Sequence, residues 1–326
     1  MARPKSAPDP YLLSKVSTLY YLRDQTQQEI ADRLSLSRPT ISRLLQEARD
    51  IGIVQIKVAP PRGLHIELES LLEERYGLRT AQVVGADVAQ PTTISVQQIG
   101  MAAASYLART VLPRQTIGLA WGSTLNAMVH ALSPLPLDDV RVVQTLGGIG
   151  PPDAEAYAAD LVRRLAQQLG AAAVLLPAPG IVSSAAVRDA LCQDRHVQAA
   201  LSLLDALDIV FVGIGALATN PVLTDGQTLP RGTHAEFVAA GAVCDIALRF
   251  FSADGLPVST SLDERILGIT TEQLRKAGQV VAVAGGPEKV DAIHAALLAD
   301  VIDVLITDFQ TAEALIQRFP VPPRRK

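Results

Sequence analysis

A glycine followed by two hydroxyl residues stands directly after a short apolar run in the middle of the chain. Residues 116–121 read as a buried strand, and Gly122, Ser123 and Thr124 follow them ahead of a helical stretch. Glycine lets a backbone approach a bound molecule, and the first turn of a helix has unpaired N–H groups. With the two hydroxyls, these groups suit an anion such as phosphate. The alternative is a plain helix cap.

Two charged residues stand in comparable places further along the chain. Lys289 ends the segment GGPEK after another apolar run, where it opposes the dipole of the helix that follows. A bound anion would explain this placement, and an ordinary solvated lysine is the alternative. Asp245, at the end of GAVCD, has a carboxylate suited to the hydroxyls of a ligand, or else to a turn or strand edge. Gly147 and Gly148 follow a further apolar run, and we expect their backbone to line the same cavity.

Several motifs that would indicate a cofactor, a metal or catalysis are incomplete. The stretch GIGALA at 213–218 fits a loose dinucleotide pattern, but Asn220-Pro221 follows where the motif requires a helix. HAE at 234–236 resembles part of a zinc-deaminase motif, yet no Pro-Cys-x-x-Cys follows it. The five histidines have no metal-ligand spacing, and the chain contains neither a Gly-x-Ser-x-Gly elbow nor a Gly-Lys-Ser/Thr phosphate loop. The sequence therefore predicts no metal, no cofactor and no catalytic residue.

The segment QQEIADRLSLSRPTISRLLQ at 27–46 has a pattern that favours polar contacts with a nucleic acid. Its apolar residues fit two helices joined by a turn, with Ser37 as N-cap and Pro39 in the first turn of the second helix. Ser35 stands where such turns often have glycine, so we expect a strained positive φ there. The alternative is a three-helix bundle with a polar outer helix. The residue types left accessible are those that bond DNA phosphates and base edges, and the predicted DNA-binding set is Gln27, Ser37, Arg38, Pro39, Thr40, Ser42 and Arg43.

The elements that must position these residues follow two different sequence patterns, one in each part of the chain. Three helical patterns occupy the first 50 residues, and residues 53–58 alternate like a strand. Residues 60–63 read as a hinge, and an acidic amphipathic helix over 64–77 reads as a connector. Short apolar strands, among them residues 280–284 and 301–307, then alternate with helices, which predicts a mostly parallel sheet covered on both faces. Ligands bind beyond the carboxyl ends of such strands, where the glycine loops lie. The expected domains are 1–60, a linker helix at 61–78, and 79–326.

Bulk composition agrees with this division. The 326 residues have a net charge of −4, but residues 1–62 contain ten Lys/Arg against six Asp/Glu, and the rest contain 19 against 27. A basic N-terminal part on an acidic body fits attraction of that part to a polyanion. Two cysteines far apart in sequence favour a reducing compartment. With no signal peptide or membrane-spanning run in the sequence, we expect a cytoplasmic protein that does not enter membranes.

The N-terminal stretch YYLRDQTQQEIADRLSLSRPTISRLLQEARDIGIVQIKV resembles the DNA-binding domain of the SorC/DeoR-like sugar-binding transcriptional regulators. The later segments AWGST, GGIG, DIVFVGIG, GAVCD, AVAGGPEKVDAI and LITDFQTAEAL occur in the order of that family. The resemblance implies a helix-turn-helix followed by a Rossmann-like α/β domain similar to sugar-phosphate isomerases. It also implies that Ser123, Thr124, Asp245 and Lys289 hold the effector.

The resulting functional prediction is a transcriptional regulator whose operator binding is controlled by a sugar, sugar phosphate or polyol. We expect no enzymatic activity, and the main alternative is a sugar-phosphate isomerase or deaminase. A structural adaptor that uses the helix-turn-helix for protein contacts is the third reading. The expected partners are double-stranded operator DNA, the small effector and further copies of the chain. We expect at least a dimer, because one helix-turn-helix reads only one half-site of an operator. The resemblance to the family implies a homotetramer. The sequence leaves repressor or activator open.

Overall fold

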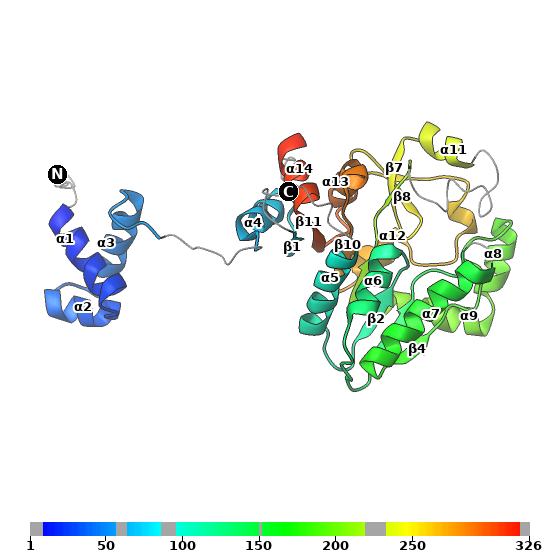
Figure 1. The fold of residues 1–326 in the computed structure, drawn as a ribbon, viewed down its shortest axis with the longest axis horizontal. Coiled ribbons are helices and arrows are strands. Elements are labelled where there is room, and N and C mark those ends of the chain that lie inside the picture. The colour runs from blue at the N-terminus through cyan, green and yellow to red at the C-terminus, as the bar shows by residue number, and fades with distance from the viewer. Residues whose placement is uncertain (1–8, 57–63, 86–95, 150–151, 219–232, 320–326) are drawn as a thin grey trace, which may run out of the picture. The chain divides into compact units, whose positions relative to one another are not determined.

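The chain forms two compact units, Met1–Pro60 and Pro61–Lys326, which are described separately (Figure 1). The coordinates are a computed structural model. The structure describes residues 9–56, 64–85, 96–149, 152–218 and 233–319, with only the backbone of residues 152–157. No helix in these ranges is both long and apolar enough to cross a bilayer.

The N-terminal unit is helical. Leu13, Val16, Ile30, Ile41 and Leu45 recur at helical spacing and are almost completely buried against one another. Three helices enclosing this small apolar core are what the sequence predicts, and the prediction is confirmed. The elements are α1 (Pro10–Ser17), the π-helical turn η1 (Thr18–Leu22), α2 (Gln27–Leu34) and α3 (Arg38–Asp50).

The strand expected at residues 53–58 is wrong for the part that the structure describes. Residues 53–56 are bend and coil, and residues 57 and 58 lie outside the described ranges. The Val54 N–H donates to the carbonyl of Ala48 at 3.0 Å, so this segment folds back on the end of α3. A strand requires a neighbouring ladder, and the described part of this unit offers none. Ile53 and Ile56 remain exposed.

The larger unit is built on a seven-stranded sheet in which every pairing is parallel. The strands run in the order β1-β11-β10-β5-β2-β3-β4. Successive strands proceed outward from β2 to β4, and the chain then returns to place β5 on the other side of β2. The strand order therefore reverses between β2 and β5. The strands are β1 (Thr80–Val84), β2 (Thr116–Leu119), β3 (Arg141–Gln144), β4 (Ala172–Val174), β5 (Ile209–Val212), β10 (Val280–Val283) and β11 (Val304–Asp308).

Helices connect and cover these strands, which confirms the predicted α/β class (Figure 1). Helices α5, α6 and α7 pack side by side. Gly100 of α5 lies so close to the backbone of Ala127 and Met128 in α6 that a side chain at position 100 would overlap them. The helices are α4 (Ile66–Tyr76), α5 (Val96–Thr110), α6 (Ser123–Ala131), α7 (Pro152–Leu169), α8 (Ala185–Cys192), α9 (Arg195–Ser202), α11 (Thr233–Ala239), α12 (Thr271–Lys276), α13 (Val290–Leu298) and α14 (Phe309–Arg318), with short 3₁₀ turns η2 (Leu203–Ala206), η3 (Asp263–Arg265) and η4 (Pro287–Lys289).

A second, antiparallel sheet of four strands belongs to the same unit. Its order is β6-β7-β8-β9, and it packs on a separate apolar cluster in which the rings of Phe237 and Phe250 stack with centroids 4.2 Å apart. The two-residue turn between β7 and β8 consists of Ala247 and Leu248, both at positive φ (50° and 61°). Its strands are β6 (Gly215–Ala216), β7 (Ala242–Ile246), β8 (Arg249–Ser252) and β9 (Pro257–Val258).

Helix α4, the connector expected from the sequence, packs within the larger unit. It contacts β1 and α14, and the division into units falls before it, after Pro60. Hydrogen bonds and the buried Leu72 attach α4 to the sheet edge, and its role as a linker stays a prediction.

Candidate functional site

The turn between α2 and α3 has the geometry that the sequence predicts. Thr26 and Glu29 form a reciprocal capping box at the start of α2, and Ser35 ends that helix in the left-handed region at φ 53° and ψ 41°. Ser37 caps α3, because its Oγ accepts from the Thr40 N–H at 3.3 Å. The strain expected at Ser35 and the cap expected at Ser37 are both present.

The first turns of α3 present a polar surface. Arg38, Pro39, Ser42 and Arg43 are exposed, while the apolar side of the helix is buried in the core of the unit. Of the other predicted DNA-binding residues, the exposed Ser37 and the half-buried Thr40 join their hydroxyls at 2.8 Å, and the half-buried Gln27 begins α2.

The last turns of α3 are occupied by internal contacts. Arg49 donates to the hydroxyl of Tyr21 at 2.8 Å and to the amide oxygen of Gln46 at 2.5 Å. The Gln46 amide in turn donates to Asp50 at 2.7 Å. The sequence offered no signal for this network, which holds the side chains of the far end of α3 against one another. The first half of α3 is therefore the part with freely exposed arginines.

The second site is a cavity of about 250 Å³ in the larger unit. It lies where the strand order reverses, because the segments that follow β2 and β5 both line it. Crevices at such a reversal are the usual ligand sites of parallel α/β sheets. The described lining residues are Ala120, Trp121, Gly122, Ser123, Thr124, Gly213, Ile214, Gly215, Ala216, Asp245, Ala247, Leu248 and Lys289.

The segment after β2 supplies a helix N-terminus to this cavity. Gly122 has φ 143° and ψ 164°, a conformation that side-chain-bearing residues rarely adopt. Ser123 is exposed, whereas Thr124 is buried and its Oγ1 donates to the Val283 carbonyl at 2.8 Å. The Thr124 hydroxyl thus fastens α6 to β10. Backbone N–H groups of the first turn of α6 and the Ser123 hydroxyl are what this segment offers to a ligand.

The turn after β10 brings Lys289 to the same cavity. Gly286 has φ 113°, and its N–H donates to Asp308 Oδ2 at 2.8 Å and to Thr311 Oγ1 at 2.9 Å. Lys289 is half-buried and is the N-cap residue of α13. A cation at that end of a helix is unfavourable by itself and is offset by a bound anion. Ser123, Thr124 and Lys289 all line this cavity, as the sequence predicts.

Asp245 reaches the cavity from the second sheet. It is 6% exposed, and its Oδ2 accepts from the Leu248 N–H at 3.1 Å, across the turn between β7 and β8. The adjacent Cys244 is fully buried, and this burial together with the Asp245 carboxylate raises the pKa of its thiol. Asp245 thus lines the cavity while supporting a turn of two non-glycine residues at positive φ.

Gly147 and Gly148 lie elsewhere, which corrects the expectation that they line this cavity. The Gly147 N–H donates to the Leu267 carbonyl, and the Gly148 N–H donates to the Ala178 carbonyl. Gly180 completes the arrangement by donating to the Gly148 carbonyl at 2.6 Å. Gly147 is needed there because a Cβ at this position would overlap the backbone of residues 178–180.

Residues 213–216 form a turn without the helix that a dinucleotide motif requires, as expected. After β5 the chain passes directly into the short strand β6 and not into a helix, so the dinucleotide motif is absent and the turn lines the cavity. Trp121, Ala247 and Leu248 were not predicted to line it. Ala-Leu is not a typical turn sequence, so the position of the last two depends on the pairing of β7 with β8.

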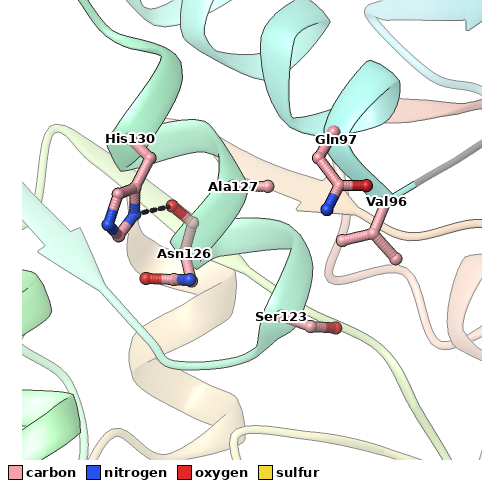
Figure 2. A pocket seen from close by; sticks show the side chains of 6 residues that line it. All are labelled: Val96, Gln97, Ser123, Asn126, Ala127 and His130. Carbon is pink, nitrogen blue, oxygen red and sulfur yellow. Dashed lines mark hydrogen bonds between the residues drawn. The ribbon is translucent and has the colours of Figure 1, made fainter.

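A neighbouring open hollow shares Ser123 with the cavity (Figure 2). Figure 2 shows Asn126 and His130 on one side of α6, while Ala127 points from that helix toward Gln97 near the start of α5. His130 Nδ1 lies 2.8 Å from the Asn126 carbonyl, and Arg164 Nη1 lies 2.8 Å from His130 Nε2. His130 is therefore engaged on both ring nitrogens. Within the described ranges, no group of three or more His, Cys, Asp or Glu side chains gathers to hold a metal.

A helix-turn-helix unit followed by a parallel α/β domain with a small ligand cavity defines the class of ligand-responsive transcriptional regulators. Residues 62–317 match the family model described as "Putative sugar-binding domain", and residues 15–50 match the model "Sigma-70, region 4". The chain belongs to the SorC/DeoR-like family of sugar-binding transcriptional regulators.

Similar proteins cover almost the whole chain. A deoxyribonucleoside regulator of Bacillus subtilis (strain 168) is 33% identical over 302 residues, 93% of this chain and 96% of that protein. The transcriptional regulator LsrR of Klebsiella pneumoniae subsp. pneumoniae is 32% identical over 311 residues, 94% of this chain and 92% of that protein. The crystal structure of the full-length sorbitol operon regulator SorC from Klebsiella pneumoniae aligns with a TM-score of 0.72 at 30% identity, covering 94% of this chain and 99% of that one.

Proposed function

We propose that this regulator responds to a small anionic sugar or polyol, such as a sugar phosphate, bound in the cavity at the strand reversal. The observation that carries the proposal is the approach of the α6 N-terminus, Lys289 and Asp245 to one cavity. The N-terminal turn and Lys289 suit an anionic group, and Asp245 suits hydroxyls. The names of two similar proteins, a deoxyribonucleoside regulator and a sorbitol operon regulator, support a hydroxylated effector.

The size of the cavity supports a single sugar unit. Ligand sites commonly have volumes of roughly 300–1,000 Å³, and this cavity of about 250 Å³ is at or below the small end. Gly122 and Gly213 leave space along the floor, since a methyl group at Gly122 would meet nothing within 4 Å.

The effector would change operator binding and would not be turned over. The chain carries a DNA-binding unit, so the binding energy of a ligand is available to shift a conformational equilibrium. The proposed DNA contacts are made by the first turns of α3, from Arg38 to Arg43, with Gln27 at the start of α2. We propose a homotetramer, in which paired copies read spaced half-sites, acting in the cytoplasm on chromosomal DNA. Measurable turnover of a sugar phosphate by the purified protein would contradict this view.

The first experiment is a thermal-shift screen with matched pairs of free and phosphorylated sugars and polyols. A ligand that binds the native state at 100 times its Kd stabilises it by about 2.7 kcal/mol. We expect a phosphorylated member of a pair to raise the melting temperature more than its free partner. A consistent preference for the free compound would show that the α6 N-terminus acts as a helix cap and not as an anion site.

The second experiment tests Lys289 with the compound selected by the screen. Hydrogen bonds to charged groups contribute about 1.5–3 kcal/mol, so Lys289→Ala should weaken effector binding by about tenfold or more. Operator affinity without effector should stay unchanged. Lys276→Ala is the matched control, because Lys276 is exposed and pairs with Glu272 at 2.7 Å outside the cavity lining. Equal effector affinity in wild type and Lys289→Ala would remove Lys289 from the site.

A further inference from the structure

Helix α4 runs along the free edge of the seven-stranded sheet. Strand β1 is the last strand on that side and pairs only with β11 among the described strands. The N–H groups of Ala81 and Val83 point away from β11 toward this edge. An exposed strand edge is normally open to pairing with other chains, so its backbone groups need partners.

Side chains of α4 provide these partners at regular intervals. Glu69 Oε1 accepts from the Val83 N–H at 2.8 Å, and Glu73 Oε1 accepts from the Ala81 N–H at 2.9 Å. His65 Nε2, just before the helix, lies 2.9 Å from the Gly85 carbonyl. We call these three contacts the edge ladder.

The spacing of the edge ladder has a simple geometric origin. Its helix residues are four apart, which is about 6.0 Å along a helix axis, and its strand residues are two apart, which is about 6.6 Å along a strand. The two repeats match closely enough for three successive contacts. The helix therefore takes the place of an eighth strand by means of side chains alone.

Apolar packing also attaches α4, because Leu68 and Tyr76 are partly buried against the core of the larger unit. Leu72 is its one buried residue, while Ile66 and Leu71 are 45% and 49% exposed. Glu69 and Glu73 are half-buried neighbours, and burial is the main reason why the pKa of Glu69 is raised. The edge ladder thus adds polar contacts to this apolar packing, and Gly77, in the left-handed conformation at φ 71°, ends the helix.

The start of α4 also lies next to residues that hold the turn carrying Lys289, which lines the cavity. The His65 ring contacts the ring of Phe309, with centroids 4.7 Å apart. Phe309 follows Asp308, whose Oδ2 holds the Gly286 N–H in the turn that carries Lys289. At the other end of α4, the Arg75 Nη1 donates to the carbonyls of Ile316 and Phe319, both at 2.7 Å, at the end of α14.

We propose that α4 is a conformational coupling element, held on the β1 edge by the edge ladder and connected to the Lys289 turn through Phe309 and Asp308. The DNA-binding unit, Met1–Pro60, precedes α4 in the chain, and a change in the docking of α4 is proposed to alter operator binding by that unit. This inference rests on the proposed function only for its effect on operator binding. The docking and its connection to the Lys289 turn can be tested without DNA or effector.

The test of the edge ladder is amide hydrogen exchange on the full chain. The double variant Glu69→Ala/Glu73→Ala should raise exchange of α4 and of Ala81 and Val83 by about tenfold, because two charge-assisted hydrogen bonds are lost. Glu67→Ala/Glu74→Ala is the matched control, since both carboxylates are exposed on the same helix and should leave exchange unchanged. Unchanged exchange in the Glu69/Glu73 variant would overturn the proposal.

Two further measurements keep the result interpretable. Unchanged protection of β10 in every variant shows that the sheet remains folded. Glu69→Gln/Glu73→Gln retains an acceptor oxygen at each position, so it should restore most of the protection that the alanine variant loses. Failure of the glutamine variant to do better than alanine would contradict a role for these oxygen acceptors.

Asp308→Asn tests the connection to the cavity. An amide nitrogen in place of Oδ2 cannot accept from the Gly286 N–H, while Oδ1 can still cap α14 through the Thr311 N–H. We expect exchange of α4 to rise about threefold or more, with the N-terminal unit unchanged. Wild-type exchange of α4 in this variant would overturn the coupling.

Operator affinity tests whether the docking of α4 affects DNA binding. If the proposed function holds, the Glu69→Ala/Glu73→Ala variant should bind operator DNA with an affinity about fivefold different from that of wild type and of the Glu67→Ala/Glu74→Ala control. Equal operator affinity in all three proteins would overturn the regulatory part of the inference. Absence of operator binding in wild type itself would count against the proposed function, and the exchange results would still stand.

Discussion

The two units build their candidate sites in opposite ways. The polar surface of the N-terminal unit comes from one continuous stretch, residues 37–43, whose side chains are placed by a helix and its cap. The cavity of the larger unit collects Ser123, Gly213, Asp245 and Lys289 from segments that are dozens of residues apart. A local site follows from local rules of spacing and capping, whereas a distributed site depends on strand order. The difference predicts that substitutions in the two units act on separate properties.

The largest expected effect is on the local site. Losing an arginine that reads a base costs about 1–3 kcal/mol, so Arg38→Ala and Arg43→Ala should each weaken operator binding by roughly 5- to 150-fold. Titration of an operator selected from a random DNA pool measures this. Arg33→Ala is the control, because Arg33 is an exposed arginine of α2 outside the predicted set.

Effector affinity should not change in either variant, since α3 belongs to the other unit. If both variants bind operator as tightly as wild type, α3 is not the recognition helix. If effector affinity also falls, the two sites are not independent, which contradicts the expectation that substitutions in the two units act on separate properties.

An effect of the same order, on stability instead of DNA binding, is expected at Gly122 in the distributed site. Its φ of 143° is strained for any residue with a Cβ, although the space around it is open. Gly122→Ala should therefore lower the free energy of unfolding by about 1–3 kcal/mol through backbone strain. Gly213→Ala is the matched control, because the added methyl would lie 3.8 Å from the Trp121 carbonyl without a positive φ.

Urea unfolding of the three proteins checks this expectation, and operator affinity should be unaffected by either change. Equal destabilisation by both substitutions would indicate that lost space, and not backbone conformation, controls this loop.

The smallest effect is expected at the turn between β7 and β8. Both of its residues have positive φ, the pattern of the hairpin turn that favours asparagine at its first position. Ala247→Asn should stabilise the protein by about 0.5–1 kcal/mol, since asparagine adopts this conformation at lower cost than alanine. Thermal unfolding measures the gain, and Ala253→Asn, outside the turn, is the comparison. A loss of stability at position 247 would mean that burial beside the cavity outweighs the backbone preference.

The sequence predicts most of the fold because its signals are local. Residues 280–284 and 301–307 were expected as buried strands, and β10 and β11 occupy these positions. The segment at 80–84 was not expected as a strand, because TAQVV lacks the continuous apolar run of β10. Its outer edge is covered by carboxylates of α4 instead of a neighbouring strand. Residues 53–56 show the reverse error, because strand-like alternation forms a strand only where a partner exists.

The candidate site was predictable where a loop carries its own chemical signal. Ser123, Thr124 and Lys289 follow strands and precede helices, and the structure brings them together. Gly147 and Gly148 follow a strand in the same way, yet their backbone pairs with residues 178 and 267. Strand order decides this difference: β3 lies one position away from the reversal, and no local pattern encodes the order of strands.

The close crossing at Gly100 has a consequence for how ligand preference can diverge among related proteins. Because α5 and α6 touch backbone to backbone, the loop that opens α6 is mounted on a pair of helices that can only move together. That side of the cavity acts as a fixed wall with a fixed place for the charged group. Substitutions that change the size or stereochemistry of the accepted ligand are then expected in the turn between β7 and β8 and in residues 213–216. Side chains at these positions can change without disturbing the packing of α5 on α6.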